Sequence, residues 1–260
     1  MNERLLDRRR FSAALAGVAA IPLIAGATRA MAAGAGARNI VLVHGLFADG
    51  SCWIDVIARL QARGLNVTSV QNPLTTLAES VAAVERVLAR QDGPTVLVGH
   101  SFGGMIVTQA GLHPNVSALV YVAARAPDAN ENYGALAATY PAPPASAGIV
   151  YDGDEGRLTE QAFLRDFAGD LPAARARSLY AVQQPFNRGL LTGQVTQAAW
   201  RSKPSFYAVS ANDRTINPDL QRFLAKRMGA TTIELPASHV SMISQPDAVA
   251  ELIVKAAGAG

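Results

Sequence analysis

The sequence predicts an α/β fold, in which helices cover both faces of a mostly parallel, doubly wound sheet. Along most of the chain, short apolar runs rich in β-branched residues alternate with longer helical patterns. Half of the 260 residues are hydrophobic and only 17% are charged, which suits a sheet that is buried on both faces. The alternation breaks at about residues 125–201, and this break predicts a helical lid inserted into a single domain of residues 33–260.

The elements before this insertion are three helices and four strands. Gly64 follows the first helix, at a position that favours glycine because the backbone turns left-handed there. The strands are expected at residues 40–43, 66–71, 95–98 and 118–122, and the helices at residues 53–63, 77–90 and 105–110.

The insertion starts at Pro127-Asp128 and contains short helical pieces at residues 160–167 and 172–180. Strands at residues 204–210 and 231–235 and helices at residues 220–228 and 248–257 follow it. Packing inside the lid is the commoner role for any one of its aromatic side chains, although as a group they favour an apolar or aromatic substrate. These aromatic residues are Tyr133, Tyr140, Tyr151, Phe163, Phe167, Tyr180, Phe186 and Trp200.

Gly99-His100-Ser101-Phe102-Gly103 is the most informative motif. Gly-x-Ser-x-Gly between a strand and a helix is the pattern of a nucleophile elbow, a sharp turn that exposes a serine hydroxyl. Glycine is needed there because a Cβ would clash with the returning helix. An ordinary glycine-rich turn is the alternative, but the apolar strand before the motif and the helix after it favour Ser101 as a nucleophile.

A serine hydroxyl needs a general base, and the base needs an acid that orients it. Among the four histidines, which are His44, His100, His113 and His239, only His239 lies in a loop after a predicted late strand and before the last helix. We therefore predict His239 as the base.

The acid is expected between the serine and the histidine in the chain. Asp213 follows the strand that precedes the one leading to His239, and catalytic groups gather at the carboxyl ends of parallel strands. Asp128, which follows an earlier strand, stays open as the alternative acid. Other carboxylates fit less well because they fall at a helix start or inside a strand, namely Asp219, Glu234 and Asp247.

Attack on a carbonyl also requires donors for the oxyanion. The residue after the nucleophile supplies one backbone N–H, here that of Phe102, and an early strand-to-helix loop supplies the second. The loop His44-Gly45-Leu46-Phe47 follows the first predicted strand, so Leu46 is the expected second donor.

Together these motifs resemble the α/β-hydrolase superfamily over about residues 38–258. The resemblance rests on Val41-Leu42-Val43-His44-Gly45, Asp49-Gly50-Ser51-Cys52-Trp53, the elbow, Asp213-Arg214-Thr215-Ile216 and Ser238-His239-Val240. The nearest branch holds small bacterial hydrolases similar to plant methyl-ester (salicylate-type) esterases and hydroxynitrile lyases. The resemblance implies a serine hydrolase that cleaves small carboxylic esters through an acyl-enzyme on Ser101.

Two departures argue against lyase chemistry, because hydroxynitrile lyases of this branch carry lysine where this chain has Val240 and threonine where it has Gly45. Ser101 also excludes the relatives that use an aspartate nucleophile, such as epoxide hydrolases. Amide, lactone or C–C bond cleavage by the same triad stays open, as does non-catalytic binding of a small molecule. No metal-ligand spacing, phosphate loop or dinucleotide fingerprint is present in the sequence, so neither a metal nor a cofactor is expected.

Residues 1–32 have the features of a cleaved export signal. Asp7-Arg8-Arg9-Arg10-Phe11 resembles the core read by the twin-arginine export machinery, an Ala-rich apolar stretch follows, and Ala30-Met31-Ala32 offers a cleavage site. We therefore expect a periplasmic or secreted protein, cleaved near Ala32 and without stable membrane insertion afterwards.

The mature protein is expected to be formally neutral. Residues 1–32 hold five of the 23 basic and two of the 20 acidic residues, which leaves 18 of each in the rest of the chain. This balance gives no reason to expect a nucleic-acid partner. Cys52 is the single cysteine, so no intramolecular disulfide can form.

Overall fold

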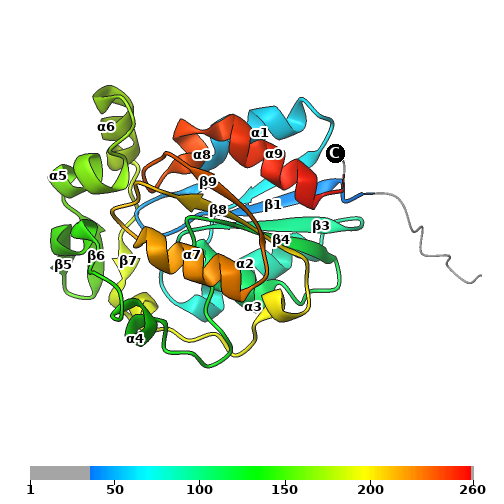
Figure 1. Cartoon of the computed structure of the whole chain (residues 1–260), viewed down its shortest axis with the longest axis horizontal. Coiled ribbons are helices and arrows are strands. Elements are labelled where there is room, and N and C mark those ends of the chain that lie inside the picture. The colour runs from blue at the N-terminus through cyan, green and yellow to red at the C-terminus, as the bar shows by residue number, and fades with distance from the viewer. Residues whose placement is uncertain (1–35, 259–260) are drawn as a thin grey trace, which may run out of the picture. The chain divides into compact units, whose positions relative to one another are not determined.

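The computed structural model describes residues 36–258, so the predicted signal at residues 1–32 lies outside the described residues. Six parallel strands form the central sheet in the order β2-β1-β3-β4-β8-β9 (Figure 1). The strands are β1 (Asn39–Val43), β2 (Asn66–Val70), β3 (Thr95–His100), β4 (Val116–Val122), β8 (Ser205–Ser210) and β9 (Thr231–Leu235). The predicted fold class is thereby confirmed.

Helices cover both faces of this sheet. On one face, α1 (Ile54–Gln61) packs against α9 (Pro246–Ala256), with α8 (Ser241–Ser244) beside them. On the other face lie α2 (Leu77–Leu88), α3 (Gly103–Ala110) and α7 (Pro218–Arg227) (Figure 1). The strands β1, β3 and β4 in the middle of the sheet are almost wholly buried, because helices exclude water from both of their faces.

Local sequence signals explain where the helices begin and end. Thr76 caps α2, since its hydroxyl accepts a hydrogen bond from the Glu79 N–H at 3.1 Å and donates one to the Glu79 carboxylate at 3.0 Å. Beyond α1, Gly64 adopts a φ of 74°, the left-handed conformation expected after a helix end. The helix expected at residues 53–63 is shorter than predicted, because a 3₁₀ turn at Gly50–Trp53 precedes it.

The insertion between β4 and β8 contains more β structure than the sequence predicted. Its helices are α4 (Tyr133–Ala137), α5 (Glu160–Ala162), which continues into a π-helical turn at Phe163–Phe167, and α6 (Ala173–Ala181). A small antiparallel sheet of β5 (Ile149–Asp152), β6 (Glu155–Leu158) and β7 (Phe186–Asn187) completes it. The turn between β5 and β6 uses Gly153 at a φ of 57°, and Asp-Gly is a common hairpin signal. In Figure 1 the insertion lies beyond the carboxyl ends of the central strands.

Candidate active site

Ser101 lies in the tight turn between β3 and α3. Its φ of 55° is left-handed, a conformation that is strained for a residue other than glycine and typical of functional sites. Three backbone hydrogen bonds hold this conformation. The Ser101 N–H donates to the Val122 carbonyl at 3.2 Å, and the Ser101 carbonyl accepts from the N–H groups of Gly104 at 3.0 Å and Arg125 at 2.9 Å. The strained serine is therefore fixed at the carboxyl end of a central strand.

The glycines around Ser101 leave no room for side chains. A Cβ at Gly103 would lie 2.7 Å from the Val43 carbonyl oxygen, and one at Gly45 would lie 2.6 Å from the Ser101 Cβ. Both distances are too short for real contacts, so these glycines let the loop after β1 pack directly against the turn that holds the serine.

His239 and Asp213 form a buried hydrogen-bonded pair. The distance from His239 Nδ1 to Asp213 Oδ2 is 2.6 Å, and both side chains are fully buried. The other oxygen of Asp213 accepts backbone N–H groups from Thr215 at 2.7 Å and Ile216 at 3.0 Å. Because an ionised carboxylate only accepts hydrogen bonds, the proton of a neutral His239 is placed on Nδ1.

The opposite ring nitrogen of His239 is free to accept a proton. His239 Nε2 is buried and has no hydrogen-bond partner among residues 36–258. The alternative acid lies elsewhere, since Asp128 pairs with Arg201 near the surface. The structure therefore places Asp213 against the histidine.

Gln221 on α7 is a part of the site that the sequence analysis missed. Its Nε2 donates to Asp213 Oδ2 at 2.7 Å and to the Ile216 carbonyl at 3.0 Å, while its Oε1 accepts the Ser210 N–H at 3.0 Å. With this bond, Asp213 accepts four hydrogen bonds, which fix the plane of its carboxylate. The sequence offered only a weak indication, because Gln221 lies between Leu220 and Leu224 in a helical pattern. In the structure all three side chains are buried.

His100, at the end of β3, packs against His239. Their ring centroids are 4.6 Å apart, and His100 Nε2 donates to the His239 carbonyl at 3.0 Å. Burial, and next the neighbouring His239, hold the pKa of His100 well below its usual value of 6.5. His100 is therefore a neutral ring that supports the loop carrying His239.

The insertion contacts the loops that hold both the acid and the base. Phe167 packs its ring 5.2 Å from that of His239, and Asp170 accepts the Ser238 N–H at 2.9 Å. Asp166 is fully buried and pairs with Arg214, which adjoins Asp213 in the chain. Residues of the insertion thus restrain the positions of both groups.

A cavity of about 240 Å³ opens at Ser101. Most of its lining is apolar, and the insertion supplies Ala145, Ser146, Ile149 and Leu191. Arg125, at the start of the insertion, also lines it, and the other lining residues are Leu46, Phe47, Ser101, Thr215 and Ile216. A second cavity of about 160 Å³, which Tyr133 helps to line, shares Arg125, Ser146, Thr215 and Ile216 with it.

Most aromatic side chains of the insertion pack against other residues of the fold instead of lining this cavity. Phe163, Phe167 and Phe186 are almost completely buried, and the ring centroids of Phe186 and Phe47 are 5.3 Å apart. Tyr133 is the insertion aromatic that lines the neighbouring cavity.

The two residues predicted to supply the oxyanion donors are Leu46 and Phe102. Leu46 lines the cavity together with Ser101, and Phe102 directly follows the serine. Within residues 36–258, neither backbone N–H is engaged by a backbone carbonyl, so both are available to a ligand.

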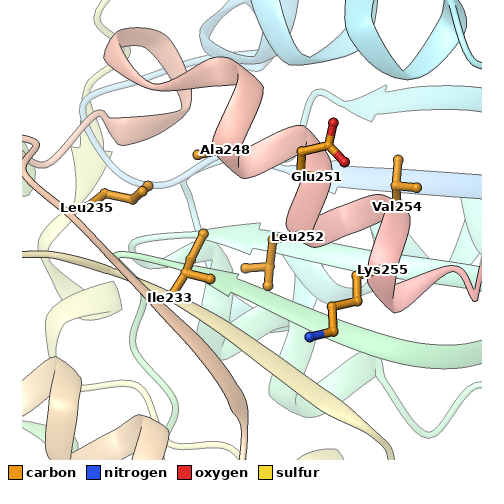
Figure 2. A pocket seen from close by; sticks show the side chains of 7 residues that line it. All are labelled: Ile233, Leu235, Ala248, Glu251, Leu252, Val254 and Lys255. Carbon is orange, nitrogen blue, oxygen red and sulfur yellow. The ribbon is translucent and has the colours of Figure 1, made fainter. Parts of the chain in front are cut away.

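A larger hollow of about 500 Å³ lies between β9 and α9 (Figure 2). Its lining is chiefly aliphatic, with the charged ends of Glu251 and Lys255 at its margin. Its lining includes none of the predicted site residues Ser101, Asp213 and His239. The candidate site is therefore the cavity at Ser101.

Residues 36–258 bring together no group of three or more His, Cys, Asp or Glu side chains that could hold a metal ion. Over the same part of the chain, no helix is both long enough and apolar enough to cross a membrane.

Known proteins resemble this chain in both sequence and fold. A pyrethroid hydrolase from Sphingobium wenxiniae is 29% identical over 85% of this chain and 88% of its own. Methylesterase 7 from Arabidopsis thaliana is 25% identical over 85% of this chain and 96% of its own. The crystal structure of polyneuridine aldehyde esterase superposes with a TM-score of 0.72 at 20% identity, over 84% of this chain and 98% of that one. The model of the alpha/beta hydrolase family matches residues 40–252, and the chain belongs to this family.

Proposed function

We propose that this chain is a serine hydrolase that cleaves small carboxylic esters through an acyl-enzyme on Ser101. The observation that carries the proposal is the buried pair of His239 and Asp213, held at 2.6 Å, together with a strained serine on the turn after β3. The names of the relatives support an ester substrate, since they include a pyrethroid hydrolase and a methylesterase.

In this mechanism His239 Nε2 takes the proton of the Ser101 hydroxyl as the oxygen attacks the ester carbonyl. Asp213 keeps Nδ1 protonated and stabilises the imidazolium that forms. The N–H groups of Leu46 and Phe102 bind the developing oxyanion. His239 then gives its proton to the leaving alcohol, and water hydrolyses the acyl-enzyme by the same steps in reverse order.

The cavity supports a small substrate with an apolar part. Its volume is about 240 Å³ and its lining is mostly apolar. We assign residues 125–201 the role of a lid, because they supply Ala145, Ile149 and Leu191 to this lining and contact the loops of Asp213 and His239.

A panel of esters, matched amides and lactones tests the reaction. The protein without residues 1–32 is expected to hydrolyse small esters with steady turnover and amides much more slowly, and Ser101→Ala is expected to lose the activity. Ester turnover at the wild-type rate by Ser101→Ala would contradict the proposal and leave a binding protein with adventitious activity.

We further propose that residues 1–32 direct export through the twin-arginine machinery. The support is the sequence alone, with Arg8-Arg9 before an Ala-rich stretch and Ala30-Met31-Ala32 after it. The mature protein is expected in the periplasm with its N-terminus near Ala33, and Arg8→Lys/Arg9→Lys is expected to leave the precursor in the cytoplasm. Full-length protein in the cytoplasm of wild-type cells would contradict this.

A further inference from the structure

Arg125 is held beside the candidate nucleophile by the backbone. Its N–H donates to the Ser101 carbonyl at 2.9 Å, so the two residues are neighbours across the turn. Its side chain lines the cavity at Ser101 and also the adjoining cavity lined by Tyr133. A ligand bound for attack by Ser101 therefore lies in a space that this side chain borders.

The guanidinium of Arg125 has no anionic partner among residues 36–258. Its Nε is buried without a hydrogen-bond partner. The Cζ of the guanidinium lies 6.0 Å from the ring centroid of Phe102 and 5.2 Å from that of Tyr133. Its Nη1 lies 3.9 Å from the Met105 sulfur. By contrast, the nearby Arg214 pairs with a carboxylate of the protein.

A guanidinium charge without an anionic partner is unfavourable where its Nε is shielded from water. Burial lowers the pKa of Arg125, but an arginine keeps its proton in proteins, so the charge stays and an anion bound beside it would be stabilised. The hydroxyl of Tyr133 is also buried without a partner, and burial raises the pKa of this tyrosine to about 12. It therefore stays a neutral donor near neutral pH, next to the guanidinium.

We propose that Arg125, with Tyr133 beside it, binds a carboxylate on the substrate, so that the preferred esters are half-esters of small dicarboxylic acids. This inference rests on the proposed function and names its substrate class. A carboxylate fits because its two oxygens match the planar fork of donors on a guanidinium. The aliphatic walls of the cavity would contact the short chain between the ester and the acid.

Paired substrates of equal shape test the inference. Monomethyl glutarate carries a carboxylate, and the methyl ester of glutaramic acid carries a neutral amide in its place. The measured quantity is the ratio of kcat/KM for the acid to kcat/KM for the amide. We expect the wild type to favour the acid and Arg125→Met to lower the ratio about 10- to 100-fold, the range for loss of a hydrogen bond to a charged group. Arg125→Lys is expected to retain part of the preference.

Arg86→Met is the matched control, because it removes the same charge from an exposed position on α2 and is expected to leave the ratio unchanged. A wild type that favours the amide, or an equal loss for both substrates in Arg125→Met, would overturn the inference. Equal loss would mean that Arg125 supports the fold and does not select an anion.

A binding measurement separates this inference from the proposed reaction. Titration calorimetry of Ser101→Ala with glutarate needs no turnover, and we expect binding that weakens at least about 10-fold when Arg125→Met is added. Binding with this dependence but no hydrolysis of any ester would support the anion site and refute the esterase. Hydrolysis of neutral esters without any binding of glutarate would support the esterase and refute the anion site.

Discussion

Replacing Asp213 by asparagine is expected to trap His239 in the wrong tautomer. Each carboxylate oxygen accepts two hydrogen bonds, one oxygen from the N–H groups of Thr215 and Ile216 and the other from His239 and Gln221. Asparagine has only one acceptor oxygen. Backbone N–H groups cannot become acceptors, so the amide oxygen stays with them and the NH₂ group turns toward the imidazole.

His239 can accept that NH₂ group only by moving its own proton from Nδ1 to Nε2. The ring then has no free Nε2 with which to take the proton of Ser101. The expected fall in kcat is about 10⁴-fold, as for loss of the orienting carboxylate in serine hydrolases. At about 1.36 kcal/mol per tenfold change, this is about 5.4 kcal/mol of transition-state stabilisation. The NH₂ group also faces the Gln221 donor, which costs about 1–3 kcal/mol of folding stability.

Steady-state ester hydrolysis measures the loss in kcat, and urea unfolding shows that the variant is folded under assay conditions. Asp128→Asn is the matched control, because that carboxylate pairs with the exposed Arg201 and was the alternative acid. It is expected to keep near wild-type turnover and to lose at most about 1 kcal/mol of stability. Near wild-type turnover by Asp213→Asn would refute the tautomer argument.

Two further predictions follow from the surroundings of this pair. Gln221→Leu leaves the Ser210 N–H unpaired and removes a donor from Asp213, so we expect urea unfolding to show a loss of about 2–5 kcal/mol, with a fall in kcat smaller than that of Asp213→Asn. Unchanged stability would contradict the hydrogen bonds described. The folded-state pKa of His100 lies well below its usual value of 6.5. Below about pH 6.5 the unfolded chain therefore binds a proton that the folded chain does not, and stability falls as pH falls, with His100 contributing at most about 1.4 kcal/mol per pH unit. Urea unfolding at several pH values between 7.5 and 5 measures how stability changes with pH. His100→Gln should make this dependence shallower, and an identical dependence in that variant would contradict the lowered pKa of His100.

The sheet was predictable because buried parallel strands have short, nearly continuous apolar sequences, such as Ile40-Val41-Leu42-Val43. The positions of Asp213 and His239 were predictable for a related reason. The loops that follow parallel strands emerge at one edge of the sheet, so residues far apart in sequence meet there. The structure shows this meeting as the 2.6 Å contact between the two side chains.

The local sequence pattern did not reveal the features that depend on packing between segments far apart in the chain. Gln221 has no motif, and its role exists only because α7 packs beside the loop after β8. Arg125 stands in an alanine-rich stretch, and only the fold shows that it borders the cavity at Ser101. The hairpin of β5 and β6 had a usable signal in Asp152-Gly153, which helical patterns nearby obscured.

Labelling with a fluorophosphonate tests the central claim most directly, because only a serine activated by a base beside oxyanion donors reacts rapidly with such a reagent. Intact mass and peptide mapping of the protein without residues 1–32 should show one adduct per molecule, on Ser101. The adduct should be absent in Ser101→Ala and should form much more slowly in His239→Ala. Ester hydrolysis by a protein that takes up no label, or that takes it up at another residue, would contradict the account.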